Sequence, residues 1–379
     1  MAKTKTTATM VAVRAAGMAG KLIALRMWQP LLSKLTSESL VLPLCPKPRV
    51  TDYRARVTFF GNPPLDYNLY TRRNSQVLVE FLYLSCMRIA LVVVLTAASA
   101  LSQEPLGQQI RAIASKAQGT VAVACSLPGS ALNCDLNPKT HPPMQSVFKL
   151  PLALTVLHQV EQGNLLLDQL VCFLPQDRIL PHVYSPLQDE YPDAGVDVPL
   201  RELLRLDVSL SDNVAADILL RLVGGPKAVN AYIAALGIRG FHLRDSEAVL
   251  HRDVSAQYRN WFEPAGAVQL LRRISDHSPL TLEHTELLLG WMTDVRTKRL
   301  EGNLPSGVHV AHKSGTSDVD HGVAHATNDI GLIPLPDGRR IAIAVFITDS
   351  TADEGTREQV IARIARAAYD SILQSRRGV

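Results

Sequence analysis

The stretch HATNDIGLIPLPDGRRIAIAVFIT, residues 325–348, predicts two β-strands joined by a tight turn. Both ends of the stretch are rich in Ile, Val and Ala, and the Pro-Asp-Gly at 336–338 is a strong turn signal. The expected strands are His325–Ile333 and Arg340–Thr348. A further strand is expected over Val308–Lys313 and a closing helix over Arg357–Leu373, so this end of the chain supplies most of a sheet.

The N-terminal side of the same region adds to the sheet. Leu106–Lys116 has helical spacing, and Thr120–Cys125 and Ala131–Leu136 read as a β-hairpin. Helical patterns fill most of the chain between the strands, over Leu150–Glu161, Leu200–Leu206, Val214–Leu222, Lys227–Leu236, Ala265–Ile274 and Leu282–Met292. This order predicts an α/β (α+β) fold, with an antiparallel sheet of about five strands built from both chain ends and flanked by helices, plus an all-α domain.

The composition is that of a globular protein with unevenly distributed charge. Of 379 residues, 47% are hydrophobic and 20% are charged, which excludes a disordered or fibrous chain. The first 86 residues hold twelve Lys or Arg and four Asp or Glu, whereas the whole chain has a net charge of only +4. The remainder is therefore slightly acidic, and it lacks the basic stripe that nucleic-acid binding requires.

A secretory signal peptide is predicted inside the chain. Met87 begins MRIALVVVLTAASA, with a basic start, a short apolar run and small residues before an expected cleavage after Ala100. We therefore expect translation to start at Met87, residues 1–86 to be an upstream extension without a clear fold, and residues 87–100 to be removed. The pattern predicts a periplasmic or secreted bacterial protein with no stable membrane anchor after cleavage.

The exported chain, residues 101–379, is expected to have two parts. Residues 101–145 and 291–379 form the α/β part, and residues 146–290 form the all-α part. Cys125 and Cys134 flank the turn of the predicted hairpin. They are either a disulfide, as an oxidising compartment allows, or two buried thiols.

Three short motifs carry candidate chemistry, and the first is Ser146-Val147-Phe148-Lys149. Serine and lysine three residues apart on a helix share a face, so a desolvated Lys149 could activate the Ser146 hydroxyl as a nucleophile. The N–H of Ser146, in the first turn, would be free to stabilise an oxyanion. The alternative is a helix N-cap serine with a surface lysine. Pro151 is expected to distort this helix locally.

The second motif is Ser211-Asp212-Asn213, just before the helix expected at Val214. Ser, Asp and Asn are favoured N-cap residues, so the motif alone is more simply a helix start. In the catalytic interpretation, Ser211 shuttles a proton to a leaving nitrogen and Asn213 orients a substrate amide.

The third motif is Lys313-Ser314-Gly315-Thr316, on a predicted strand. Lys313 offers a positive charge to a carboxylate, Ser314 and Thr316 offer hydroxyl groups, and the Thr316 N–H is a candidate second oxyanion donor. Glycine at 315 would let a substrate backbone approach closely. The alternative is an edge strand with a basic residue.

The three motifs, in this order, resemble those of the penicillin-recognising serine enzymes, and most closely those of the class A β-lactamases. The resemblance covers roughly residues 104–375. It implies the fold of that family, a β-lactam as the small-molecule partner, no cofactor and a monomeric enzyme.

Further residues resemble class A and, within it, the extended-spectrum PER/VEB branch. The likeness to that branch rests on His251, on the Gln257–Trp261 segment after it, and on the segments Gln145–Lys149 and Arg299–Gly302. Tyr184 is similar to the tyrosine wall of the class A pocket, and Glu247 stands where that family has the glutamate that activates the deacylating water. His251 replaces the asparagine that many class A enzymes have four residues later, which implies an altered geometry of this water. Arg299 is implied as a second cation for the substrate carboxylate.

The resemblance implies hydrolysis through an acyl-enzyme. Ser146 attacks the lactam carbonyl, Ser211 relays a proton to the ring nitrogen, and Glu247 activates the water that releases Ser146. The acylation base is either Lys149 or Glu247 acting through water. Two rival functions share the nucleophile: a D-Ala-D-Ala carboxypeptidase or transpeptidase without a dedicated deacylating acid, and a β-lactam sensor domain that binds covalently without turnover.

A metal site is not expected. The histidines at 309, 312, 321 and 325 lack the spacing of known metal-binding motifs. His309 and His312 would also lie on opposite faces of a strand, so they could not share a metal ion there.

Overall fold

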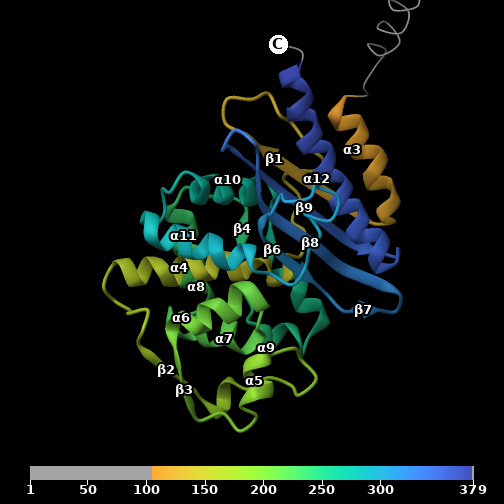
Figure 1. The fold of residues 1–379 in the computed structure, drawn as a ribbon. Coiled ribbons are helices and arrows are strands. Elements are labelled where there is room, and N and C mark those ends of the chain that lie inside the picture. Colours follow the sequence, from red (N-terminus) through yellow and green to blue (C-terminus); the bar gives the residue numbers. More distant parts are fainter. Residues whose placement is uncertain (1–104, 378–379) are drawn as a thin grey trace, which may run out of the picture. The chain divides into compact units, whose positions relative to one another are not determined.

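The computed structural model describes residues 105–377, which contain a five-stranded sheet (Figure 1). The strand order is β1-β9-β8-β6, with β7 paired to β8, and these pairings are all antiparallel. The strands are β1 (Thr120–Ser126), β6 (Ala311–Thr316), β7 (Val319–Asp320), β8 (Val323–Pro334) and β9 (Arg340–Ser350). Both ends of the described chain build the sheet, which confirms the predicted fold class.

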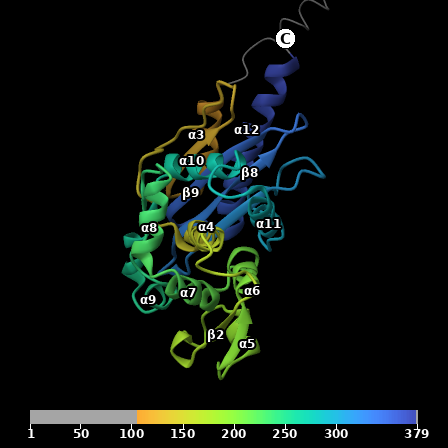
Figure 2. The same cartoon turned by 90° about the vertical axis from the view of Figure 1, so that its left-hand side faces the viewer.

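Helices cover both faces of the sheet (Figures 1 and 2). On one face, α3 (Leu106–Ala114) and α12 (Glu354–Arg377) pack on each other, and α12 packs on the strands. On the other face lies α10 (Pro264–Ser275). The side chains of β9 point alternately into two hydrophobic cores, one on each face of the sheet. Those of Ile341, Ile343, Val345 and Ile347 pack in the core with α3 and α12, and those of Ala342, Ala344 and Phe346 pack in the core with α10. Burial on both faces explains the unbroken apolar run in the sequence.

The helical part is organised around α4 (Lys149–Glu161), which follows a 3-10 turn, η2 (Gln145–Phe148). Residues 149–157 of α4 are all buried, as expected for a helix that is apolar on every side. The other helices of this part are α5 (Pro186–Glu190), α6 (Leu200–Arg205), α7 (Asn213–Leu222), α8 (Pro226–Ala235), α9 (Glu247–Leu250) and α11 (Leu282–Thr293). Pro151 is the third residue of α4, in the first turn, where proline is tolerated, and α4 continues without a break from Lys149 to Glu161.

The predicted all-α part is not wholly helical. Two small antiparallel pairs lie within it, β2 (Leu170–Phe173) with β3 (Val196–Pro199) and β4 (Phe241–His242) with β5 (Trp261–Phe262). These strands hold only two to four residues each, which is too short for a periodic pattern to reveal.

The hairpin predicted at the N-terminal end of the sheet is wrong. β1 pairs with β9, and residues 131–136 make only one isolated bridge to it, between Leu136 and Val123. Within this segment the Asp135 N–H donates to Asn133 Oδ1, a local bond that competes with strand pairing.

A disulfide joins Cys125 and Cys134. Of the two alternatives, a disulfide or two buried thiols, the structure has the disulfide. Their sequence separation is nine residues, and Cys134 is buried. The bond ties the irregular 131–136 segment to β1.

Several sequence expectations concern residues outside this structure. The upstream extension, the signal peptide and the proposed start at Met87 lie before the described residues 105–377. Among those residues, none of the helices has the length and apolar character needed to cross a membrane.

Candidate active site

The three motifs meet at one cleft of about 560 Å³. Its walls include Ser146, Ser211, Asn213 and the whole Lys313–Thr316 segment. Tyr184 and His251 also line it. Lys149 and Glu247 lie deeper, with side chains only 0% and 3% exposed. The fold therefore brings the three motifs, which are more than sixty positions apart in the sequence, together at this cleft.

The nucleophile candidate lies on a tightly held turn. Gln145 has a φ of 48°, a conformation that non-glycine residues rarely adopt, and Ser146 follows it in η2. The Asn328 side chain donates to the carbonyl oxygens of Pro143 and Met144, at 2.9 and 3.3 Å. The turn is thereby attached to β8.

Gly315 allows β6 to lie directly against this turn. A Cβ at position 315 would be 2.5 Å from the Met144 carbonyl oxygen and 3.2 Å from the Ser146 backbone nitrogen. The space that the glycine leaves is thus filled by the protein's own backbone, not kept for a substrate backbone as the sequence suggested. The Ser146 N–H lies next to the strand that carries Thr316, as a two-donor oxyanion site requires.

Lys149 lies at the centre of a set of oxygen atoms. Its Nζ is 3.1 Å from Ser146 Oγ, 2.8 Å from the Ser211 carbonyl oxygen and 3.4 Å from Ser211 Oγ. It is also 2.5 Å from Asn213 Oδ1 and 3.0 Å from Glu247 Oε1. The lysine therefore contacts the nucleophile, two of the three residues of the second motif (Ser211 and Asn213) and the candidate general base.

The second motif is both a helix cap and part of the cleft. Asp212 is the N-cap of α7, and its carboxylate accepts from the Ala215 N–H and from the hydroxyl of Ser185. The helix-start explanation is therefore correct for Asp212. Ser211 has a φ of 59° at the end of a π-helical turn, η4 (Leu206–Leu210). This conformation directs its carbonyl and its hydroxyl toward Lys149.

Glu247 faces the nucleophile. Its Oε1 accepts from Ser146 Oγ at 3.4 Å. A water molecule hydrogen-bonded to both of these oxygen atoms would therefore lie to one side of the line between them, and not on that line. The start of α9 is fixed by Asp217, whose two carboxylate oxygens accept from the N–H groups of Glu247 and Ala248 at 2.8 and 2.9 Å. Burial raises the pKa of Asp217 to about 6, although these two bonds oppose the rise.

His251 lies between Glu247 and Asn213. Its Nε2 is 3.6 Å from Glu247 Oε2 and 3.3 Å from Asn213 Nδ2. Burial lowers the pKa of His251, although the charge of Glu247 opposes this, so the ring is neutral near pH 7. A neutral imidazole thus lies beside the Glu247 carboxylate, and the Asn213 amide contacts the same ring nitrogen.

Lys313 is buried and hydrogen-bonded to Ser211. Its Nζ donates to Ser211 Oγ at 2.9 Å and to the Ser314 carbonyl oxygen at 3.1 Å. Burial lowers the pKa of Lys313 to about 7, and the positive charge of Lys149 acts in the same direction. Ser314 Oγ accepts from Thr297 Oγ1 at 3.0 Å.

Arg299 lies behind β6 and, in the part of the chain that the structure describes, is not among the residues that line the cleft. Its guanidinium is buried, with Nε 2.9 Å from Glu358 of α12 and Nη1 3.3 Å from the Gly315 carbonyl oxygen. Direct contact with a substrate carboxylate stays a prediction. Arg296, which the sequence analysis missed, does line the cleft and donates to the Tyr184 hydroxyl at 2.7 Å.

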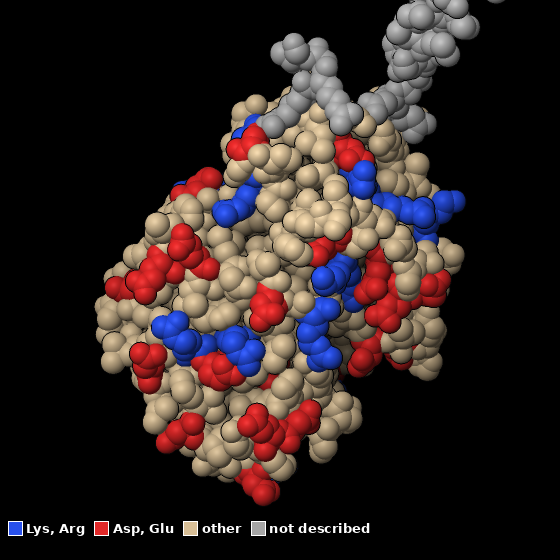
Figure 3. Space-filling view, viewed as in Figure 1, with Lys and Arg blue, Asp and Glu red and all other residues tan. Residues whose placement is uncertain are grey.

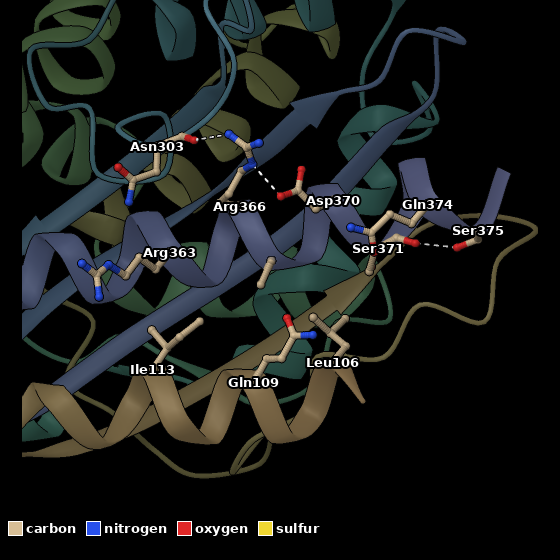
Figure 4. A pocket seen from close by; sticks show the side chains of 11 residues that line it. Leu106, Gln109, Ile113, Asn303, Arg363, Arg366, Asp370, Ser371, Gln374 and Ser375 are labelled. Carbon is tan, nitrogen blue, oxygen red and sulfur yellow. Dashed lines mark hydrogen bonds and ion pairs between the residues drawn. The ribbon is translucent and has the colours of Figure 1, made fainter. Parts of the chain in front are cut away.

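The structure contains a second, larger hollow of about 870 Å³ between α3 and α12 (Figure 4). Its serines are committed to the helix: Ser371 donates to the Ala368 carbonyl oxygen and Ser375 to that of Ser371. Arg366 pairs with Asp370 at 2.7 Å. Among its described lining residues no hydroxyl is next to a general base, so the hollow lacks the arrangement that nucleophilic catalysis needs.

Other site types find little support in the described residues. His312 is buried and pairs with Asp329 at 2.8 Å, whereas His309 is exposed. Within residues 105–377 no group of His, Cys, Asp or Glu could hold a metal ion. Figure 3 shows acidic and basic side chains interspersed on the face it presents, without a continuous basic stripe.

The functional residues that sequence reasoning missed have weak signals. Asp217 is an acidic residue within the apolar run of α7. Arg296 is one of three basic residues in the segment 296–299. An acid among apolar residues could have marked Asp217 as a buried carboxylate. Neither pattern could have identified the groups that Asp217 and Arg296 contact.

Comparisons with known proteins agree with this geometry. A model of the beta-lactamase enzyme family matches residues 105–372. The extended-spectrum beta-lactamase PER-1 of Pseudomonas aeruginosa is 42% identical over 276 residues, which are 72% of this chain and 89% of PER-1. Beta-lactamase VEB-1 of the same organism is 36% identical over 242 residues, covering 63% of this chain and 80% of VEB-1.

Solved structures give the same result. A beta-lactamase from Chitinophaga pinensis is 42% identical with a TM-score of 0.68, covering 70% of this chain and 99% of that protein. The TLA-1 extended-spectrum beta-lactamase is 37% identical with a TM-score of 0.68, covering 70% and 98%. The chain therefore belongs to the beta-lactamase enzyme family, and within it to the serine-dependent class A.

Proposed function

We propose that the protein hydrolyses the amide bond of β-lactams through an acyl-enzyme on Ser146, which Glu247 releases by activating water. One observation carries this proposal. Glu247 Oε1 lies 3.4 Å from Ser146 Oγ and 3.0 Å from Lys149 Nζ, within a buried pocket. A carboxylate in this position can take a proton from the nucleophile and later from water.

Acylation begins with removal of the Ser146 proton. Glu247 can accept it through a water molecule, or Lys149 can accept it after giving its own proton to Glu247 across 3.0 Å. Both routes leave Glu247 protonated and make Ser146 Oγ the nucleophile; in the second, the Ser146 proton itself is on Lys149. The structure is compatible with either base, and the choice between them stays open.

The carbonyl oxygen of the substrate would bind between the N–H groups of Ser146 and Thr316. These backbone donors belong to rigid elements, a turn fixed by Asn328 and a strand of the central sheet. Donors held in advance stabilise the negative charge of the tetrahedral intermediate without reorganisation.

The leaving ring nitrogen needs a proton, and Ser211 is placed to supply it. Its hydroxyl accepts from Lys313 at 2.9 Å and from Lys149 at 3.4 Å, so the Ser211 proton can pass to the nitrogen and be replaced by one from Lys149. Lys149 then takes a proton back from Glu247 across 3.0 Å, so Glu247 is again a carboxylate before deacylation. Lys313, Ser314 and Thr316 would bind the substrate carboxylate. Arg296 adds a second cation at the rim of the cleft, where it would meet a second carboxylate of the substrate.

Deacylation would use the group formed by Glu247, His251 and Asn213. Asn213 Oδ1 is bonded to Lys149, and its amide nitrogen faces His251. We therefore assign His251 to the binding of the deacylating water and Asn213 to both Lys149 and the substrate. Tyr184 would form a wall for the substrate.

The contact between Glu247 and Ser146 argues against the rival functions. A cell-wall carboxypeptidase or transpeptidase, or a sensor domain, would keep the acyl group of a β-lactam, because it has no dedicated acid placed to activate water against that acyl-enzyme. Here a carboxylate lies within hydrogen-bond distance of the acylated oxygen.

We also propose that the enzyme acts as an exported monomer in the periplasm or outside the cell. The predicted signal peptide and the Cys125–Cys134 disulfide support export. N-terminal sequencing of the native protein should find a start near residue 101, and a start within residues 1–86 would contradict this.

Turnover of a chromogenic cephalosporin by the purified protein tests the catalytic proposal. The wild type should hydrolyse many equivalents per molecule, and Ser146→Ala should hydrolyse none above background. A single stoichiometric burst by the wild type would instead indicate a sensor or a cell-wall enzyme.

A further inference from the structure

The loop that carries Glu247 is closed at its base. Arg259 Nε pairs with Asp245 Oδ2 at 2.7 Å. The Asn260 side chain accepts from the Asp245 N–H at 2.9 Å and donates to the Asp245 carbonyl oxygen at 2.8 Å. Residues 245–260 therefore form one closed loop that contains α9. Because the two ends are tied together, an attachment at one point of the loop restrains the whole of it, Glu247 included.

A 3-10 turn of this loop, η5 (Val254–Arg259), is attached to the central sheet through Tyr258. The Tyr258 hydroxyl donates to Asp349 Oδ1 of β9 at 2.5 Å, and it lies 2.7 Å from His325 Nδ1 of β8. His325 Nδ1 is itself 2.8 Å from Asp349 Oδ1. An ionised carboxylate can only accept, so Tyr258 Oη and His325 Nδ1 both carry a hydrogen atom. The three side chains form a cluster that joins the loop to two strands.

The surroundings of Tyr258 keep its hydroxyl group a donor. Burial raises the pKa of Tyr258, and the hydrogen bond to Asp349 acts in the same direction. The rings of Tyr258 and His325 also meet edge to face, with their centroids 5.8 Å apart. Tyr258 is 42% exposed and the Asp349 side chain is 50% exposed, so the cluster should contribute moderately and its loss should not unfold the protein.

The sheet departs from regular pairing at this cluster. Within the described strands, the β8–β9 ladder includes the residue pairs on either side of His325 and Asp349 but omits these two residues. Asp349 has a φ of 50°, a conformation that a non-glycine residue adopts only at a cost. Backbone strain of this kind persists where the surrounding contacts over-determine it, and here both side chains contact Tyr258.

The nucleophile turn has its own attachment to the sheet. Asn328 of β8 donates to two carbonyl oxygens of this turn. The loop also meets the turn, where Gln145 Nε2 donates to Gln257 Oε1 at 2.8 Å. Because the turn keeps the Asn328 bonds when the loop is loosened, loss of the cluster should displace Glu247 more than Ser146.

We propose that Tyr258, His325 and Asp349 are positioning residues for deacylation. They hold the loop against the sheet, so that the carboxylate of Glu247 stays where it can activate water. Asp217 fixes the start of α9, and the cluster fixes the loop beyond it. Among the described residues that line the cleft, none belongs to the cluster, so it acts through the loop and not on the substrate. The inference rests on the proposed function, because the step that it concerns is the release of the acyl group.

The acylation and deacylation steps have separate readouts. In an acyl-enzyme mechanism kcat/KM reports binding and acylation, whereas the decay of the acyl-enzyme, followed by rapid quenching and intact-protein mass spectrometry, reports deacylation. Tyr258→Phe removes the hydroxyl and keeps the ring, and Asp349→Gly removes the carboxylate at a φ that glycine adopts freely. With a chromogenic cephalosporin, both variants should lower the deacylation rate constant by about three- to tenfold, as for one lost hydrogen bond, and keep kcat/KM within about twofold of the wild type.

Asp349→Asn is the conservative variant, because its amide oxygen can still accept from Tyr258 and because asparagine tolerates a positive φ. It should retain most of the deacylation rate. Thr351→Val is the matched control. It removes the hydrogen bond from Thr351 Oγ1 to Gln118 Oε1, which lies just beyond β9 and does not involve the loop, so both rate constants should stay close to those of the wild type.

Hydrogen exchange tests the attachment of the loop without a substrate. In Tyr258→Phe the amide groups of residues 248–258 should exchange at least about threefold faster than in the wild type, whereas those of α4 should be unchanged. A general loss of stability would instead speed exchange in both places.

The outcomes separate the two claims. A wild type without turnover contradicts the proposed function, whereas exchange in the loop still decides whether the cluster holds it. The role of the cluster is overturned if folded Tyr258→Phe and Asp349→Gly deacylate at the rate of the wild type, or if exchange in the loop is unchanged. A fall of kcat/KM as large as that of the deacylation rate, or a loss in Asp349→Asn as large as in Asp349→Gly, would also overturn it.

Discussion

Replacing Gly315 by alanine should separate the two walls of the cleft. A Cβ at this position would lie 2.5 Å from the Met144 carbonyl oxygen, and real Cβ atoms essentially never come closer than 3.0 Å to such an atom. The carbonyl belongs to the backbone and a Cβ is fixed directly to it, so neither can rotate away. β6 and the turn before Ser146 must therefore move apart by at least roughly 0.5 Å.

This displacement falls on the proposed oxyanion donors. The N–H groups of Ser146 and Thr316 lie on opposite sides of the contact, and a misplacement of about 1 Å costs on the order of a hundredfold in rate. We therefore expect kcat/KM to fall by about tenfold to a hundredfold. Overpacking should also lower the free energy of unfolding by about 1–3 kcal/mol.

Two glycine variants control for general damage to the fold. Gly331→Ala places a Cβ 2.6 Å from His312 Cβ in the β6–β8 pairing, away from the nucleophile turn, so it should lower stability but retain most of the kcat/KM. Gly290→Ala in α11 meets nothing within 4 Å and should raise stability by up to about 1 kcal/mol.

Steady-state rates with a chromogenic cephalosporin and thermal unfolding of all three variants provide the comparison. The reasoning is refuted if Gly315→Ala keeps the kcat/KM of the wild type, or if Gly331→Ala loses as much activity as Gly315→Ala.

Three further predictions follow from single contacts. The pKa of Asp217 is raised to about 6 in the folded state, so its protonated form stabilises the fold below about pH 4, and this contribution is lost as pH rises through 6. In denaturant unfolding, the free energy of unfolding of Asp217→Asn should therefore depend less on pH than that of the wild type, and parallel pH profiles would contradict this. Reduction of the Cys125–Cys134 disulfide should lower the free energy of unfolding by about 2–3 kcal/mol, and identical midpoints with and without reductant would count against it. Arg296→Ala should raise KM by about two- to fivefold for β-lactams with a second carboxylate, as for an exposed ion pair, and equal changes for uncharged side chains would exclude this role.

The sheet could be predicted because its strands are buried on both faces and separated by a strong turn. The apolar run at 340–348 and the Pro-Asp-Gly turn leave few other arrangements. The segment 131–136 could not be predicted in the same way, because local side-chain bonds and the disulfide decide its conformation. Short pairs such as β4 with β5 depend on contacts between distant segments.

The site was predictable where residue type itself carries the chemistry. Ser146, Lys149, Ser211 and Lys313 belong to the three motifs that carry the family resemblance, and the structure brings them together; their catalytic roles stay predictions. The placement of Arg299 was not predictable, because its guanidinium is directed by Glu358, fifty-nine residues further along the chain.

The central claim is that Glu247 releases the acyl group from Ser146. Intact-protein mass spectrometry of Glu247→Ala after brief mixing with a cephalosporin tests it most directly. The account predicts one covalent adduct per chain, located on the peptide that contains Ser146 and persisting long after the wild type has returned to its unmodified mass. Turnover by Glu247→Ala at the rate of the wild type, with no accumulated adduct, would contradict it.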